Sequence, residues 1–181
     1  MKIYVMRHGK TNWNENGTIQ GRSNNRLSNN GKAVVEEVAL KQKDTKFDII
    51  FCSPLMRTMQ TANIMNQYHN VKILKDERLI EIEQGIFTRR KKSTLSDVEK
   101  QQRENRDISC GMEKYEEVYE RTKDFLNYLK KQKYESVLVV THNINASLMA
   151  GIFDNISIDF KNDKHIGNFK NADIREFNLV T

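Results

Sequence analysis

Two apolar segments, far apart in the chain, each run directly into a histidine. The first is residues 2–8, Lys-Ile-Tyr-Val-Met-Arg-His, and the second is residues 136–142, Ser-Val-Leu-Val-Val-Thr-His. Short apolar runs of this kind predict strands that are buried on both faces, as in parallel sheets covered by helices. Ligands of such sheets bind at the carboxyl ends of the strands, where the strand order reverses. His8 and His142 are therefore both predicted at the ligand-binding edge of one sheet.

Strand patterns alternate with helix patterns along most of the chain. Strands are predicted over residues 2–7, 47–52, 71–74, 136–140 and 173–180, and helices over about 31–43, 53–68, 112–132 and 143–153. This alternation predicts an α/β fold of three layers, α/β/α, with a mostly parallel central sheet and right-handed crossovers. The last strand is expected at an edge of the sheet.

Local signals refine two of these helices. Ser28 or Asn29 is suited to cap the helix at 31–43. The apolar residues that support this helix are Ala33, Val34, Val38 and Leu40. Ser53-Pro54 is expected to begin the next helix, because proline at an early helical position loses no hydrogen bond.

The length of 181 residues fits one domain, residues 1–181, with a sizeable core. Residues 86–111 are polar, charged and weakly periodic, so they are expected to form a small cap inserted into that domain. Two cysteines do not make a disulfide framework. The chain shows neither a signal-peptide pattern nor an apolar stretch long enough to span a membrane, so a cytoplasmic location is expected.

The net charge of +6 favours solubility and is compatible with an anionic ligand. A nucleic-acid partner is not predicted, because the one dense basic run, residues 89–92, is short. A small-molecule partner is expected instead, and the sequence does not indicate the oligomeric state.

Arginines and carboxylates accompany the two histidines at the predicted sheet edge. Arg7 precedes His8, and Arg57 lies on the first turn of the helix that follows the second strand. A guanidinium beside a helix N-terminus is suited to a phosphate. Glu81 and Glu83 follow the third strand and would face the same side of an extended segment, so either is a candidate proton donor.

Five motifs in a fixed order connect these residues. They are Arg7-His8-Gly9 with Thr11; Trp13-Asn14, Gly17, Gln20-Gly21 and Leu27-Ser28 with Gly31; Ser53-Pro54-Leu55 with Arg57 and Thr61-Ala62; Arg78-Leu79-Ile80-Glu81 with Gly85; and Val139-Val140-Thr141-His142. In these motifs the chain resembles the histidine phosphatase superfamily, also called the phosphoglycerate mutase-like family, from residue 3 to about residue 150.

The resemblance implies a role for each matching position. His8 is the nucleophile that takes the phosphoryl group, and the side chains of Arg7, Arg57 and His142 bind the phosphoryl oxygens. A neutral imidazole is a competent nucleophile, and covalent capture divides one displacement into two easier ones. Two arginines and a protonated His142 would supply the positive charge without a metal ion.

The remaining matches concern the proton donor and the pocket walls. Glu81 protonates the leaving oxygen and then activates water, which requires a pKa above the ordinary value for glutamate. Asn14 and the backbone near Asn143 line the phosphate pocket, and Asn143 is suited to cap the helix that follows. No cofactor and no metal are implied.

Three departures from the family pattern concern substrate range. Lys10 stands where the family often has Glu, and Asn143 stands where it often has Gly. Residues 86–89 replace a Trp-Glu-Gly-like stretch that normally helps to cover the site. The short segment 86–111 predicts a small cap that admits water, which favours a phosphomonoesterase over a phosphoglycerate mutase.

Two other readings remain open. His8, His142 and Glu81 have the ligand types of a zinc hydrolase, although Arg7 beside His8 would repel a cation. The chain is alternatively a catalytically silent phosphate-binding module, because fold does not determine function. The physiological phosphate ester is not indicated by the sequence.

Overall fold

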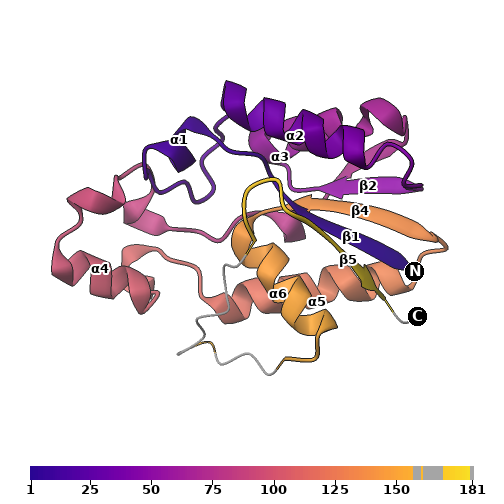
Figure 1. The fold of residues 1–181 in the computed structure, drawn as a ribbon. Helices are drawn as coiled ribbons and strands as arrows, with labels where there is room; N and C mark the ends of the chain where they lie inside the picture. The colour runs from indigo at the N-terminus through magenta and orange to yellow at the C-terminus, as the bar shows by residue number, and fades with distance from the viewer. Residues whose placement is uncertain (157–159, 161–168, 180–181) are drawn as a thin grey trace.

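The computed structural model describes residues 1–156, 160 and 169–179. Its centre is a five-stranded sheet in the order β3-β2-β4-β1-β5 (Figure 1). The strands are β1 (Lys2–Arg7), β2 (Ile49–Cys52), β3 (Lys72–Lys75), β4 (Ser136–Thr141) and β5 (Ile174–Asn178). Only β5, at the edge beside β1, pairs antiparallel. The predicted fold class, a mostly parallel sheet between helices, is confirmed.

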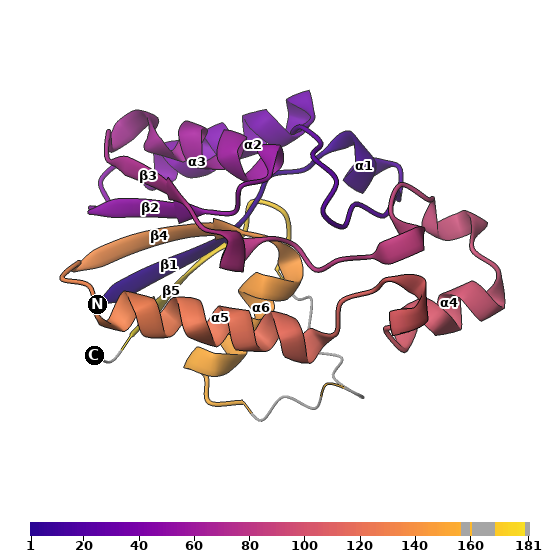
Figure 2. The same cartoon turned by 180° about the vertical axis from the view of Figure 1, so that it is seen from behind.

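Helices cover both faces of this sheet. Helices α2 (Asn29–Lys41) and α3 (Met56–Met65) lie on one face, and α5 (Tyr115–Lys130) and α6 (Asn143–Phe153) lie on the other (Figures 1 and 2). Two short helices, α1 (Asn12–Glu15) and α4 (Asp97–Glu104), lie beyond the sheet. Single 3-10 turns follow at Asn66–Tyr68, Glu77–Leu79, Gly85–Phe87, Lys92–Thr94 and Ile108–Cys110.

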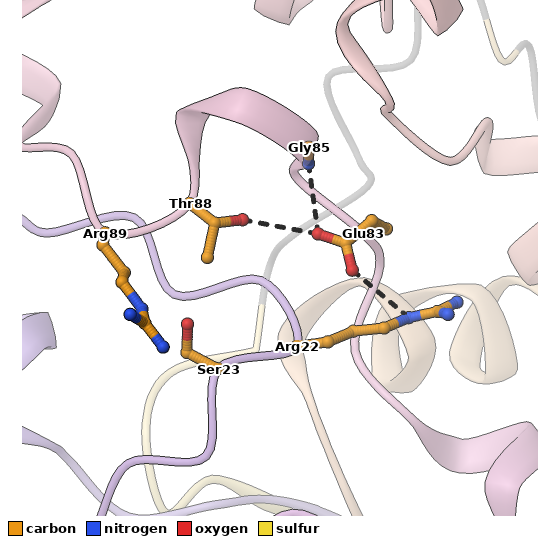
Figure 3. Close-up of a pocket in the computed structure, with 6 residues that line it drawn as sticks. All are labelled: Arg22, Ser23, Glu83, Gly85, Thr88 and Arg89. Carbon is orange, nitrogen blue, oxygen red and sulfur yellow. Dashed lines mark hydrogen bonds and ion pairs between the residues drawn. The ribbon is translucent and has the colours of Figure 1, made fainter.

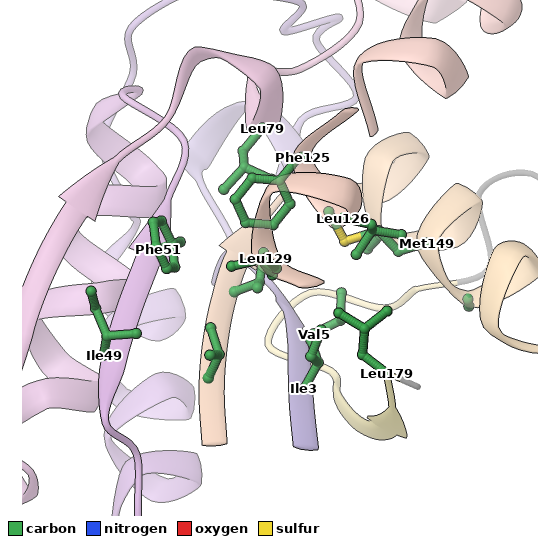
Figure 4. Close-up of a cluster of buried hydrophobic side chains, with 14 of the residues drawn as sticks. Ile3, Val5, Ile49, Phe51, Leu79, Phe125, Leu126, Leu129, Met149 and Leu179 are labelled. Carbon is green, nitrogen blue, oxygen red and sulfur yellow. The ribbon is translucent and has the colours of Figure 1, made fainter. Parts of the chain in front are cut away.

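Each helical layer has its own apolar core. Phe51 on β2 packs edge-on against Phe125 of α5, within a buried cluster that also includes Leu129 and Met149 (Figure 4). On the opposite face, Val35 and Met65 belong to a second buried cluster. The strands contribute to both clusters because successive side chains of a strand point to opposite faces. The sheet is thereby held as a rigid platform.

The buried face of α2 consists of residues other than the apolar ones noted in the sequence. The buried residues are Gly31, Val35 and Ala39, one turn apart, whereas Val34 and Leu40 are exposed. Of the apolar residues noted in the sequence, Val38 is partly buried against the second cluster, whereas Ala33 is exposed as well. The helix packs mainly through residues at a four-residue spacing, and Gly31 lets its backbone approach the chain after β1 closely. The predicted cap is confirmed: the hydroxyl of Ser28 accepts a hydrogen bond from the amide of Gly31.

Helix α3 begins at Met56 and not at Ser53-Pro54. Ser53 still belongs to the sheet, because its amide donates to the carbonyl of Val140 on β4. Its hydroxyl is bonded to His142, so the segment 53–55 serves the site before the helix starts.

The topology brings the two histidines together. Strands β1 and β4 are neighbours, and Arg7 lies opposite Thr141 in their parallel register. The amide of His8 then donates to the carbonyl of Thr141 at 3.0 Å. The chain leaves β1 toward the α2 face and leaves β4 toward the α6 face (Figure 1). The carboxyl ends of these two strands therefore flank the crevice in which α/β sheets bind ligands.

Residues 86–111 extend away from the sheet on the side that carries these histidines (Figure 2). They hold α4 and surround a small buried cluster formed by Ile19, Phe87, Leu95, Cys110 and Met112. Within the part of the chain that the structure describes, no helix is long and apolar enough to cross a membrane.

Candidate active site

His8 is buried at the end of β1 with its ring held in one tautomer. Its Nδ1 lies 2.7 Å from the carbonyl oxygen of Gly9, which can only accept, so Nδ1 carries the proton. The Nε–H group of Arg57 donates to Nε2 at 3.3 Å, which places the lone pair on Nε2. Burial, and then the positive charges of Arg57 and Arg7, hold the pKa of His8 well below its ordinary value. The environment of His8 therefore favours the neutral imidazole, with its proton on Nδ1 and a lone pair on Nε2 that accepts the bond from Arg57.

Arg57 is completely buried and is already extensively hydrogen-bonded. Its terminal nitrogens donate to the carbonyls of Ser23 and Gly21 and to the side-chain oxygen of Asn25. Burial lowers the pKa of Arg57 to about 10. The guanidinium therefore ties the loop at residues 21–25 to α3 as well as facing His8, a second task that its sequence position did not indicate.

His142 is fully buried and lies face to edge with His8, with 5.2 Å between ring centroids. Its Nε2 is 2.8 Å from the hydroxyl of Ser53. Its Nδ1 has no hydrogen-bond partner among the described residues and lies 3.9 Å from a carboxylate oxygen of Glu81. Burial, followed by the charge of Arg57, lowers the pKa of His142 well below its ordinary value. In the free site this shift disfavours the protonated form of His142, which the sequence predicts when a phosphoryl group is bound.

Glu81 lies at the same site, with its side chain 14% exposed. Its carboxylate accepts a hydrogen bond from the amide of Ile82. Burial raises the pKa of Glu81, and the nearby charges of Arg57 and Arg7 only partly oppose that shift. A raised pKa keeps a carboxyl group protonated at higher pH, as a general acid requires.

Glu83 does not share this environment. Its carboxylate faces a separate pocket of about 410 Å³, where the amide of Gly85 and the hydroxyl of Thr88 donate to it and Arg22 lies 3.9 Å away (Figure 3). The expectation that Glu81 and Glu83 face one side was wrong, because residues 80–84 do not form a regular extended strand. The structure thereby distinguishes two carboxylates that the sequence left equivalent.

A small cavity of about 150 Å³ is lined by Arg7, Asn14, Glu81 and Asn143, among other residues. The Nε of Arg7 is buried without a partner among the described residues, while its NH1 donates to the carbonyl of Phe169 at 2.6 Å. An unpaired buried donor is costly, so this cavity is suited to an anion.

The amide side chains of Asn14 and Asn143 take part in local structure. The side-chain oxygen of Asn14 accepts from the amide of Thr11 in a capping box at α1. The side-chain oxygen of Asn143 accepts from the amide of Phe169. Asn143 is the first residue of α6, and its cap position is occupied by His142, so the predicted Asn143 cap was wrong. Both residues line the cavity, and neither amide NH₂ group donates a hydrogen bond to another of the described residues.

Two cations of the segment 86–111 also line this cavity, Lys92 and Arg103. The Nε of Arg103 is buried and has no partner among the described residues. Burial, then the charges of Arg103 and Arg7, lower the pKa of Lys92. Sequence reasoning noted Lys92 only as part of the basic run at residues 89–92 and missed Arg103, because nothing in a polar, irregular segment shows which of its cations point inward. In the same described ranges, no three His, Cys, Asp or Glu side chains are grouped as metal ligands.

Comparison with known proteins places this geometry in a family. The profile of the histidine phosphatase superfamily (branch 1) matches residues 3–178. Phosphoserine phosphatase 1 of Hydrogenobacter thermophilus is 29% identical over 151 residues, which are 80% of this chain and 72% of that protein. The probable phosphoglycerate mutase GpmB of Cronobacter sakazakii is 37% identical over 99 residues, 55% of this chain. Those residues span about half of that relative, 46%.

Solved structures share the fold over almost the whole chain. The mycobacterial glucosyl-3-phosphoglycerate phosphatase superposes with a TM-score of 0.84 at 18% identity, covering 97% of this chain and 90% of that one. Bacillus stearothermophilus YhfR superposes with a TM-score of 0.83 at 20% identity, covering 97% and 89%. With the matched profile and the paired histidines at the sheet edge, these similarities establish that the chain belongs to the histidine phosphatase superfamily, as an enzyme that acts on phosphate esters.

Proposed function

We propose that this protein hydrolyses phosphate monoesters without a metal ion, through a phosphohistidine formed on His8. The observation that carries the proposal is the state of the His8 ring, neutral and with its proton on Nδ1. Its Nε2 carries the lone pair and accepts a hydrogen bond from Nε of Arg57, and Arg7 precedes His8 at the end of β1. A nucleophile of this kind needs no general base, because it carries no proton on the attacking nitrogen.

The cavity supports the binding of a phosphoryl group through Arg7 and Glu81, which line it, while His8 and His142 are buried behind that lining. The buried Nε of Arg7 and Nδ1 of His142 lack partners among the described residues, and phosphate oxygens would satisfy both. The dianionic charge of a phosphate monoester would raise the pKa of His142 and favour the ring that donates from Nδ1. The NH₂ groups of Asn14 and Asn143 add two neutral donors.

The reaction then proceeds in two balanced steps. In the first, Nε2 of His8 attacks phosphorus, the ester P–O bond breaks, and Glu81 gives its proton to the leaving alkoxide. In the second, the Glu81 carboxylate takes a proton from water, the water oxygen attacks phosphorus, and the P–N bond breaks. Inorganic phosphate leaves and His8 is again neutral. Positive groups around the transferring phosphoryl stabilise the charge on its oxygens in both steps.

Water as the acceptor distinguishes this proposal from a mutase. Residues 86–111 form only single turns and the eight-residue helix α4 around a small cluster. We treat them as a small cap within one domain, residues 1–181. A cap of this size leaves water access to the phosphohistidine, and water then completes hydrolysis.

The proposed substrate carries a second anionic group. Lys92 and Arg103 reach the cavity from the cap and line it together with Arg7. The relatives named for phosphoserine and for glucosyl-3-phosphoglycerate act on phosphate esters that also carry a carboxylate. A carboxylate or second phosphate would pair with these cap cations while the ester phosphate lies at His8.

Rapid acid-free quenching after mixing with an aryl phosphate tests this function. We expect the quenched protein to carry a phosphoryl group that is stable to alkali and lost in acid, as for a phosphoramidate. We also expect steady release of inorganic phosphate. His8→Ala should lose both, by about 10⁴-fold or more in turnover. The control His69→Ala, which changes the histidine packed against Phe47, should keep both. Turnover without a histidine-bound phosphoryl group would contradict the proposal.

A further inference from the structure

Glu113 is a buried carboxylate that lies outside the cavity and binds two arginines from different segments. Its side chain is 11% exposed. The Nε of Arg121, on α5, donates to its Oε1 at 3.1 Å, and NH2 of Arg22, from the first loop, lies 3.1 Å from its Oε2. Most ion pairs at protein surfaces are solvated and contribute little to stability. Glu113 differs from them, because its carboxylate is nearly buried and pairs with two cations.

All three side chains also hold the backbone that carries Glu81. Arg121 donates through NH1 to the carbonyl of Arg78 at 2.6 Å, and Arg22 donates through Nε to the carbonyl of Glu81 at 3.2 Å. The carboxylate of Glu113 accepts from the amide of Glu83 at 3.0 Å. The segment at 78–83 has no regular secondary structure after Leu79, so these side-chain bonds replace the ladder that would otherwise fix it.

A third arginine closes the same network from the cap. Arg106 is buried, and its guanidinium donates to the carbonyls of both Glu83 and Glu113. The backbones of Gln84 and Met112 form an isolated antiparallel bridge beside it. The end of the cap, the first loop and α5 therefore all meet at Glu113.

We propose that Glu113 is a positioning residue for the general acid Glu81. Its carboxylate holds Arg22 and Arg121 on the segment at 78–83 and balances their positive charge, so that Glu81 is aimed at the leaving oxygen and stays protonated. This inference rests on the proposed function, because it needs Glu81 to act as the acid.

The charges around Glu81 predict the direction in which the pKa of Glu81 would shift if the charge of Glu113 were lost. The charged and titratable groups around Glu81 come from every neighbouring element: Arg7 at the end of β1, Arg22 in the first loop, Arg57 on α3, Lys92, Arg103 and Arg106 of the cap, Arg121 on α5 and His142 before α6. The charge of Arg121 lowers the pKa of Glu81, and its partner Glu113 offsets that charge. Loss of the Glu113 charge would therefore lower the pKa of Glu81 and reduce the fraction of Glu81 that is protonated near and above that pKa.

The experiment measures kcat/KM, which reports formation of the phosphohistidine, on an alkyl and an aryl phosphate across pH. Glu113→Gln should lower kcat/KM on the alkyl phosphate by about tenfold and change the aryl value by less than about twofold, because only the alkoxide needs the acid. In the pH profile of Glu113→Gln, the falling limb of kcat/KM on the alkyl phosphate should move to lower pH by about one pH unit. Glu113→Asp keeps the charge, so its limb should stay at the wild-type pH even where its rate is lower. Glu99→Gln, which breaks a carboxylate–Arg90 pair on the cap, is the matched control and should match wild type in both readouts.

Each result decides one question. Equal losses on both substrates, with an unmoved limb, would overturn the positioning role and leave Glu113 as a structural residue only. A Glu113→Gln enzyme identical to wild type would overturn it as well. Glu81→Gln, measured in parallel, separates the two levels: if it is fully active on the alkyl phosphate, the acid assignment in the proposed function fails first.

Discussion

The Nε–H group of Arg57 donates a hydrogen bond to Nε2 of His8. This is the nitrogen proposed to attack phosphorus, so in the free site the arginine occupies the lone pair that the reaction uses. Phosphate binding has to replace this bond with a contact to phosphorus, while the remaining N–H groups of Arg57 keep their bonds to the loop at 21–25. Arg57 thus links the nucleophile to the loop that borders the cavity.

Replacing Arg57 with lysine tests that link. Lysine keeps a positive charge but lacks the planar fork of donors, so the carbonyls of Gly21 and Ser23 lose their partners. We expect kcat/KM on an aryl phosphate to fall by about 10²–10³-fold and the melting temperature to decrease. Arg26→Lys, at the exposed arginine that directly follows this loop, should leave both unchanged. Near-wild-type activity of Arg57→Lys would show that charge alone is sufficient.

The two carboxylates at 81 and 83 should separate by leaving group. Glu81→Gln should lower kcat/KM on an alkyl phosphate by about 10²–10⁴-fold and affect an aryl phosphate far less, because phenolate leaves without a proton. Glu83→Gln should show no such preference, because its carboxylate is bonded to Gly85 and Thr88 in the separate pocket (Figure 3). A leaving-group effect in Glu83→Gln and not in Glu81→Gln would reverse the assignment.

The pH profile should follow two opposite pKa shifts. His8 reacts as the neutral ring, and its pKa is held well below 6.5, so the rising limb of kcat/KM should lie below that pH. Glu81 donates as the protonated acid, and its pKa is raised above 4.5, so activity on alkyl phosphates should persist above that pH and fall as pH rises through the shifted value. Both shifts widen the active window. The control is Glu81→Gln, which should lose the falling limb that belongs to the acid. Alkyl phosphate turnover that keeps rising into alkaline pH would contradict this account.

The cap cations should select for a second negative charge. Lys92→Met and Arg103→Met remove charge from the cavity wall and should each raise KM by about tenfold for a phosphate ester that carries a carboxylate. The same variants should change KM by less than about threefold for a phosphate ester whose alkyl or aryl group carries no charge. Arg89→Met, at an exposed cap arginine that lines the other pocket, is the control. Equal effects on both substrate classes would argue for a general electrostatic role.

Gly31 offers a stability test of the packing beside the nucleophile. A Cβ at this position would lie 2.0 Å from the carbonyl oxygen of Lys10. Glycine to alanine inside a helix ordinarily stabilises it, but here the backbone contact should reverse the sign. We expect Gly31→Ala to lower the free energy of unfolding by about 1–3 kcal/mol in urea titrations. Asn30→Ala, at the exposed neighbour, should stay within about 0.5 kcal/mol of wild type. A stabilised Gly31→Ala protein would refute the close contact.

Much of the architecture followed from local patterns in the sequence. The strands that end before His8 and His142 are recognisable because buried parallel strands are continuous apolar runs, and α6 begins and ends where its pattern does. Motif order then identified the family without any knowledge of contacts. The face of α2 was not recoverable, because small residues such as Gly31 carry no hydrophobic signal.

Only the tertiary structure decided the finer chemistry of the site. It separated Glu81 from Glu83, because the turn geometry at 80–84 depends on arginines contributed by distant segments. It turned Lys92 and Arg103 toward the cavity, which depends on how the cap packs around its own small cluster. Short sequence motifs identify the residue types that the reaction needs. The burial, hydrogen-bond partners and tautomers of these side chains depend on neighbours far apart in the chain, so they are determined only once the chain has folded.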